Sequence, residues 1–254
     1  MSSYASYAAP APSDRLSISR RSGASIDQES TCLTIFAGIL FAVGCSSYLV
    51  GTILNLPQIG ATDAWMYSAI GAGVFILCGL VEYCNYMGGF HVFLIFAGIF
   101  GLVAEVLDGQ QHPISVHFNF VANHMYFCEA VKVYYAHAED FHFMEIAQKY
   151  MMIETLKIAD VLFVLGTIID IVLSWIYLFT GTPNAPGSLA ITGSGDHLNL
   201  LRTDDQKIVE VASASLWFAC AILTLIVYIR MARVKASVGE DEEEDEKTKL
   251  SRGV

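Results

Sequence analysis

Six long apolar runs, separated by short polar segments, constrain this chain more than any other feature of its sequence. The runs are 33–54, 65–86, 90–107, 114–135, 158–179 and 209–231. A helix needs about 20 mostly apolar residues to cross the hydrocarbon core of a bilayer. The fourth run is the least apolar, so it either spans the bilayer or packs as a helix on its surface. The sequence therefore predicts an all-α, polytopic transmembrane helical bundle of about six spans.

The composition agrees with lipid as the main solvent of the chain. Hydrophobic residues make up 54% of the sequence and charged residues 15%, whereas soluble domains contain about 45–50% apolar and about 25% charged residues. The net charge of −11 owes much to seven consecutive acids at 240–246. No basic patch with interleaved aromatic residues is present, so nucleic-acid binding is not expected. No two of the six cysteines form a CxxC pair, and they are interpreted as buried small apolar residues.

The two ends of the chain differ from its middle. Residues 1–31 are rich in Ser, Ala, Tyr and Pro and contain no apolar run, so they are predicted to form a disordered tail. They have no hydrophobic region typical of a signal peptide. Residues 236–254 are predicted to form an acidic disordered tail. The transmembrane domain is expected to cover 32–235, with the lipid bilayer as its main partner and the tails as possible binding segments for cytosolic proteins.

Lysine and arginine predict the orientation, because they are enriched in cytosolic loops. They cluster in the N-terminal segment, in the link between the fourth and fifth runs, and just after the sixth run. These residues are Arg15, Arg20, Arg21, Lys149, Lys157, Arg230, Arg233 and Lys235. Six spans with both termini in the cytosol put all three clusters on one side. Arg202 and Lys207, between the fifth and sixth runs, are the exceptions. Neither the organelle nor the oligomeric state follows from the sequence.

Short strings recur in the chain. Residues 40–44 and 162–166 share a Leu-Phe-apolar-apolar-Gly pattern, and each string begins a hairpin whose second helix holds a central cysteine, Cys78 or Cys220. This suggests two related hairpins that flank a distinct middle pair of helices. Internal duplication of this kind occurs in many transporters.

The same region carries a resemblance to a known family. An acidic-apolar lead at 153–160 precedes the string 162–166, the last apolar helix ends in basic residues at 228–233, and 123–130 holds an Asn-His-apolar-Glu-Ala pattern. In these features the chain resembles the YrhK-like family of small integral membrane proteins. It departs from the family pattern at Ala214-Ser215, where a Gly-Ser pair is expected. The resemblance implies helical hairpins in a membrane, and it implies no activity.

Polar residues gather in the fourth run. His117 and His124 lie seven positions apart, so they share one helix face, and Asn123, Glu129 and Lys132 lie near that face. Three interpretations stay open: a hydrogen-bond network that holds the bundle together, a proton or ion pathway, or a metal site with His117 and His124 as ligands. No compact metal-binding motif supports the last one, and no cofactor is expected.

One carboxylate lies midway along the fifth run. A charge at the centre of a transmembrane helix costs about 2.5–3.5 kcal/mol, so Asp170 must be protonated, paired or facing water. The expected partners are His117, His124 or Lys132, which belong to the one cationic helix. The acids Glu82, Glu105, Asp108 and Asp160 also lie in or near the spans; Glu82, Glu105 and Asp160, nearer the helix ends, are interpreted as structural.

Three functional readings remain open from the sequence. The first is a non-enzymatic scaffold or sensor in the membrane. The second is a small proton or cation transporter or channel that uses Asp170 and the His117/His124 stripe. The third is a membrane metal or haem redox protein. No nucleophile elbow or phosphate-binding loop is present, so an enzyme is less expected than a binding or transport protein.

Overall fold

The computed structural model describes residues 31–86, 91–139, 152–180 and 203–251. Within these residues the chain forms six α-helices and no strand. The helices are α2 (Thr31–Leu54), α3 (Ala64–Tyr86), α4 (Val92–Gly109), α5 (Ser115–Glu139), α7 (Ile153–Thr180) and α8 (Thr203–Ser251). The predicted all-α helical bundle is therefore confirmed. Nearly all of the predicted N-terminal tail lies outside the described residues, as do 140–151 and 181–202.

Turn residues separate the helices. After α2, Pro57 interrupts the apolar sequence and Gly60 adopts a positive φ of 56°, a conformation that glycine takes at little cost. Gln111, with a φ of 58°, lies in the turn between α4 and α5. Five helices are long and apolar enough to cross a membrane, namely α2, α3, α4, α7 and α8, and they make the chain compatible with an integral membrane protein.

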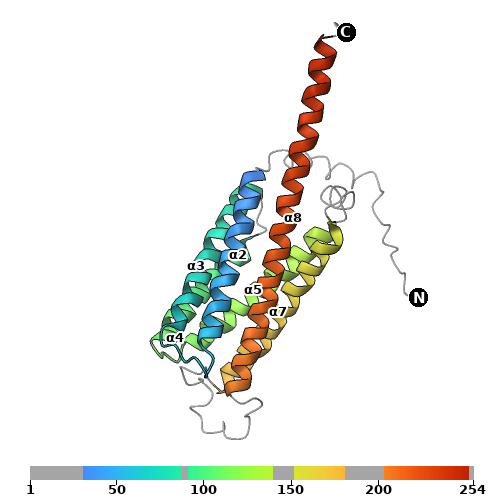
Figure 1. Cartoon of the computed structure of the whole chain (residues 1–254). Helices are drawn as coiled ribbons and strands as arrows, with labels where there is room; N and C mark the ends of the chain where they lie inside the picture. Colours follow the sequence, from blue (N-terminus) through green and yellow to red (C-terminus); the bar gives the residue numbers. More distant parts are fainter. Residues whose placement is uncertain (1–30, 87–90, 140–151, 181–202, 252–254) are drawn as a thin grey trace, which may run out of the picture.

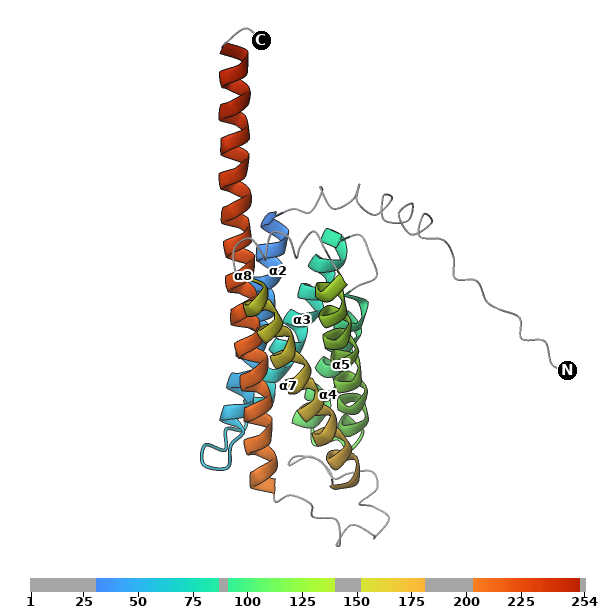
Figure 2. The same cartoon turned by 90° about the vertical axis from the view of Figure 1, so that its right-hand side faces the viewer.

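The polar helix α5 is the sixth member of the bundle. It contacts α4 on one side and α7 on the other, and it runs alongside α4 in Figure 2. Its 25 residues make a helix about 37 Å long at about 1.5 Å per residue. Its buried residues, among them Ala122, Tyr126, Glu129 and Ala130, recur at spacings of three and four, which places them on one face toward the other helices.

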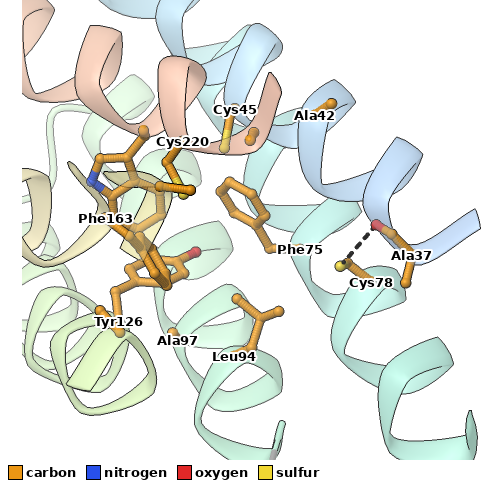
Figure 3. Close-up of a cluster of buried hydrophobic side chains, with 14 of the residues drawn as sticks. Ala37, Ala42, Cys45, Phe75, Cys78, Leu94, Ala97, Tyr126, Phe163 and Cys220 are labelled. Carbon is orange, nitrogen blue, oxygen red and sulfur yellow. Dashed lines mark hydrogen bonds between the residues drawn. The ribbon is translucent and has the colours of Figure 1, made fainter. Parts of the chain in front are cut away.

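The six helices form a closed ring. Each helix contacts the next one along the chain, and α8 closes the ring by contacting α2. Aromatic side chains fill its middle. Trp217 on α8 has ring centroids of four other helices around it, at 4.9 Å (Tyr126), 5.1 Å (Phe163), 5.8 Å (Phe75) and 6.4 Å (Tyr48). Figure 3 shows Phe75, Tyr126 and Phe163 pointing toward one another in this cluster.

Helix α8 is longer than the sequence predicted. It continues through Ser251 and projects well beyond the other helices (Figure 1), whereas 236–254 was expected to be disordered. The backbone up to Ser251 is drawn as helix, which differs from that expectation. Glu and Lys are good helix formers, and Glu243 precedes Lys247 by four residues, a spacing that stabilises a helix.

Candidate functional site

A polar pocket opens at the end of the ring where α2, α4 and α7 end and α3, α5 and α8 begin. Its volume is about 470 Å³. Loop residues between α2 and α3 and Gln111 between α4 and α5 form part of its wall, and residues from all six helices form the rest. The lining residues used below are Tyr48, Asn55, Trp65, Glu105, Asp108, Ser115, Tyr177, Lys207 and Glu210.

Carboxylates dominate the charge of this pocket. Glu105 and Asp108 lie one turn apart in the last part of α4, and Glu210 lies near the start of α8. Glu210 accepts a hydrogen bond from the Tyr177 hydroxyl. The ammonium group of Lys207 donates to the backbone oxygen of Asn55 at 2.6 Å and to its Oδ1 at 3.3 Å. The described lining therefore combines three carboxylates with one ammonium group, so the pocket favours a cationic ligand.

One wall of the pocket presents an unpaired polar group. Ser115, the first residue of α5, is 1% exposed, and its hydroxyl has no hydrogen-bond partner among the described residues. A buried donor or acceptor without a partner costs about 1–3 kcal/mol. Because Ser115 lines the pocket, a ligand or water in the pocket is the natural partner for this hydroxyl.

Asp170 lies further inside the ring and is 5% exposed. The Ser213 hydroxyl of α8 donates to Asp170 Oδ1 at 2.5 Å, and Asn123 Nδ2 of α5 donates to the Asp170 backbone oxygen at 3.2 Å. The Asp170 side chain therefore faces the interior of the bundle. The predicted pairing with His117, His124 or Lys132 is wrong, because the structure joins the carboxylate to Ser213.

The histidine stripe of α5 does not form one site. His117 is exposed, and His124 Nδ1 lies 2.7 Å from the Phe120 backbone oxygen, with its ring packed on Phe120 at 4.1 Å. Glu129 follows His124 by five residues, which turns it about 140° around the helix at about 3.6 residues per turn, and it is buried. Among the residues that the structure describes, no three His, Cys, Asp or Glu side chains gather as ligands for a metal ion.

A second polar cluster lies at the opposite end of the ring. His91, directly before α4, places Nδ1 2.8 Å from Glu82 Oε2 on α3 and 2.9 Å from Glu129 Oε1 on α5. Burial by itself lowers the pKa of His91, but its hydrogen bonds to Glu129 and Glu82 outweigh burial and raise the pKa from 6.5 to about 10. Nearby, the Lys132 ammonium lies 5.4 Å from the centroid of the Phe93 ring. His91 is therefore a cation that joins three helices.

Only weak signals in the sequence pointed to these residues. His91 lies at the start of the third apolar run and matches no periodic pattern, so its two partners were missed. Glu210 was missed because it falls at the polar start of the sixth run. Glu105 and Asp108 were noted only as acids near a helix end. Their spacing of three residues on α4 places them on neighbouring positions of one face, which was the available clue.

The aromatic cluster separates the two polar regions. Along α3, Ser68 lines the pocket, Phe75 follows seven residues later, and Glu82 follows seven residues after that. Phe75 packs on Trp217, Tyr126 and Phe41. The buried thiol of Cys78, one turn beyond Phe75, donates to the Ala37 backbone oxygen at 3.4 Å (Figure 3). The ring thus has a polar pocket at one end, an aromatic layer in the middle and an ionic cluster at the other end.

No family model matches the chain, and neither a curated protein nor a solved structure matches it. The resemblance to the YrhK-like family therefore stays a prediction.

Proposed function

We propose that this protein is a small cation carrier of the membrane, with the pocket as its cation site and Asp170 as a proton-exchanging group. The acid-lined pocket is the observation that carries the proposal. Pockets inside a helical bundle are common sites for small ligands, and ionisable residues within spans often mark ion or proton pathways.

The position of Asp170 supports a role coupled to the pocket. Asp170 precedes Tyr177 on α7 by seven residues, and Ser213 follows Glu210 on α8 by three. The pairs Tyr177–Glu210 and Asp170–Ser213 therefore lie in sequence from the pocket toward the aromatic layer. A cation that enters the pocket meets a series of carboxylates, and the aromatic layer blocks simple leakage through the ring.

The expected topology decides which side of the membrane each polar region of the carrier faces. With both termini cytosolic, the pocket opens on the side away from the cytosol, and the His91 cluster lies near the cytosolic side. Transport then requires the helices to move so that the aromatic layer opens, as alternating access requires in other transporters.

A flux measurement tests the proposal. Purified protein in proteoliposomes with an internal pH-sensitive dye should move protons when a gradient of a small cation, such as methylammonium, Na⁺ or K⁺, is imposed. Asp170→Asn should fold and lose the flux. The matched control is Glu154→Gln, an exposed acid at the opposite end of α7, which should leave the flux unchanged. Flux equal to that of empty liposomes for every cation would reject the carrier.

A scaffold or sensor role is the second candidate, and the length of α8 favours it. This helix extends beyond the bundle and carries the acidic run 240–246, which suits a basic cytosolic partner. Deletion of 236–254 separates the candidates: a carrier keeps its flux, whereas a scaffold loses its partner. The third reading, a metal or haem redox protein, is tested by an absorption spectrum and metal analysis of the purified protein.

A further inference from the structure

We infer that the pocket takes an extended organic dication, a linear diamine, and this inference rests on the proposed carrier function for its biological setting. Four features of the pocket favour such a ligand: the arrangement of its carboxylates, the unpaired hydroxyl in its wall, its aromatic lining and its size.

The carboxylates lie on two separate walls. Glu105 and Asp108 belong to α4, and Glu210 belongs to α8. In the ring, α4 lies between α3 and α5, and α8 lies between α7 and α2, so the two acidic walls face each other across the pocket. A chain with a charge at each end can place one ammonium group at each of these walls.

Each wall can receive an ammonium group. An ammonium group has three N–H donors and no acceptor, so it needs several oxygen atoms around it. The α4 side offers the carboxylates of Glu105 and Asp108 and, from the start of α5, the unpaired hydroxyl of Ser115. Glu105 and Asp108 also lie near the C-terminus of α4, where the helix dipole favours a positive charge.

On the α8 wall, Lys207 precedes Glu210 by three residues, and among the described residues the two form no ion pair within 4.0 Å. The ammonium group of Lys207 donates to Asn55 at the end of α2, and Glu210 accepts a hydrogen bond from the Tyr177 hydroxyl. A carboxylate accepts about four hydrogen bonds, so Glu210 has capacity for an incoming ammonium group.

Aromatic residues of the lining suit the carbon chain of such a ligand. The aromatic rings of Tyr48, Trp65 and Tyr177 are part of its lining. Aromatic faces attract ammonium groups and cover methylene groups. The volume of about 470 Å³ falls within the range of about 300–1,000 Å³ that is usual for organic ligands, and it is far larger than a bare metal ion needs.

A binding experiment with matched amines tests the inference. Calorimetric titration of full-length protein in nanodiscs would compare 1,4-diaminobutane with 1-aminobutane, which has the same carbon chain and one charge, and with Ca²⁺. Both amines are charged near neutral pH, because alkyl ammonium groups titrate at about pH 10.4. We expect the diamine to bind at least about tenfold more tightly than the monoamine, which corresponds to about 1.4 kcal/mol.

Variants assign the two ends of the ligand. Glu105→Gln and Glu210→Gln should each weaken diamine binding by about tenfold or more, toward the affinity of the monoamine. Ser115→Ala is a smaller change that should also weaken the diamine, and Glu154→Gln should have no effect. If a glutamine variant unfolds at a lower temperature than the parent protein, its binding data are set aside. Ser115→Ala then provides the comparison, because this substitution keeps the volume of the site nearly unchanged.

The outcomes separate this inference from the carrier proposal. Equal affinity for diamine and monoamine, or binding of Ca²⁺ without binding of the diamine, overturns the inference. Diamine binding without any cation flux in proteoliposomes supports the inference and rejects the carrier. Flux of small cations without diamine binding rejects the inference alone.

Discussion

Asp170 shows how a single carboxylate is accommodated inside an apolar ring. Its Oδ1 accepts a hydrogen bond from Ser213 at 2.5 Å, and the same hydroxyl lies 3.0 Å from the Gly166 backbone oxygen. We expect Asp170→Asn to keep the fold, because the amide oxygen still accepts from Ser213. Asp170→Leu should destabilise the protein by about 1–2 kcal/mol, the usual size of an interhelical polar contact in lipid.

The stability comparison uses unfolding in mixed detergent micelles. Asp205, an exposed acid at the start of α8, provides the matched control: Asp205→Leu should change stability far less. If Asp170→Leu unfolds at the same midpoint as the parent protein, the contact with Ser213 contributes nothing to stability.

From the raised pKa of His91 we expect the stability of the fold to depend on pH in the alkaline range. Its pKa is raised from 6.5 to about 10, because the hydrogen bonds to Glu129 and Glu82 outweigh the effect of burial. A raised pKa means that the folded state binds the proton more tightly than the unfolded state. The stabilisation is therefore complete below about pH 6.5 and is lost as the pH rises through about 10.

The variant His91→Gln isolates this contribution from other groups that titrate near pH 10. The difference in unfolding free energy between parent and variant should be largest near pH 6 and shrink toward pH 10. A difference that stays constant over this range would show that His91 carries no proton in the ionic cluster.

At the scale of the helices, small residues decide how closely α7 and α8 approach. A Cβ atom added to Gly166 would lie 2.5 Å from Trp217 Cδ1 and 2.7 Å from its Nε1. Trp217 cannot move aside easily, because rings from four other helices surround it. Gly166→Ala should therefore destabilise the fold by about 1–3 kcal/mol, as overpacking of a core does, despite the better helix propensity of alanine.

Gly73 on α3 is the matched control for this substitution. A Cβ atom there meets nothing within 4 Å, so Gly73→Ala should stabilise the helix by up to about 1 kcal/mol. Thermal unfolding of the two variants in the same detergent gives the comparison. A Gly166→Ala protein that is as stable as Gly73→Ala would contradict the close packing of Trp217 on α7.

Hydropathy located the helices better than it located their ends. The run 65–86 corresponds closely to α3, because polar turn residues border it. The run 209–231 is much shorter than α8, which covers Thr203–Ser251. An apolar run marks the part of a helix that suits lipid, whereas the helix itself continues for as long as its backbone hydrogen bonds are stable. The polar extension of α8 was therefore read as a disordered tail.

Contacts between helices were not predictable from spacing along one helix. Glu129 was placed near His124 because they are close in sequence, yet it bonds to His91 from another helix. Asp170 was assigned a cationic partner on grounds of charge, but the hydroxyl of Ser213 satisfies it. Hydroxyl groups occur throughout the apolar runs, so nothing in the sequence singled out Ser213 as the partner.

At the scale of the whole molecule, the closed ring places functional groups at opposite ends. The start of α2 and the long extension of α8 share one end (Figure 1), and the acidic pocket lies at the other. Because α5 belongs to the ring, each of the six helices runs opposite to the one before it. A five-span alternative, in which α5 lies on the membrane surface, would reverse the side of every segment after α5.

Cysteine labelling from the outside of intact cells distinguishes the two topologies. The exposed native residues Cys32, Cys84 and Cys128 are first replaced by alanine, and the three buried cysteines stay. Single cysteines are then introduced at Ser22, Thr62, Gln148, Ser194 and Ser237. Thr62 is preferred to Gly60, because the positive φ of Gly60 disfavours any side chain.

Six spans with cytosolic termini predict that an impermeant maleimide labels positions 62 and 194 only. Five spans predict labelling at 62, 148 and 237 and protection at 22 and 194, because each segment after α5 changes side. That second pattern would reject the six-span topology and would move the long arm of α8 out of the cytosol. Labelling at 22 together with protection at 62 would show that the protein has the inverted orientation, with the acidic pocket on the cytosolic side.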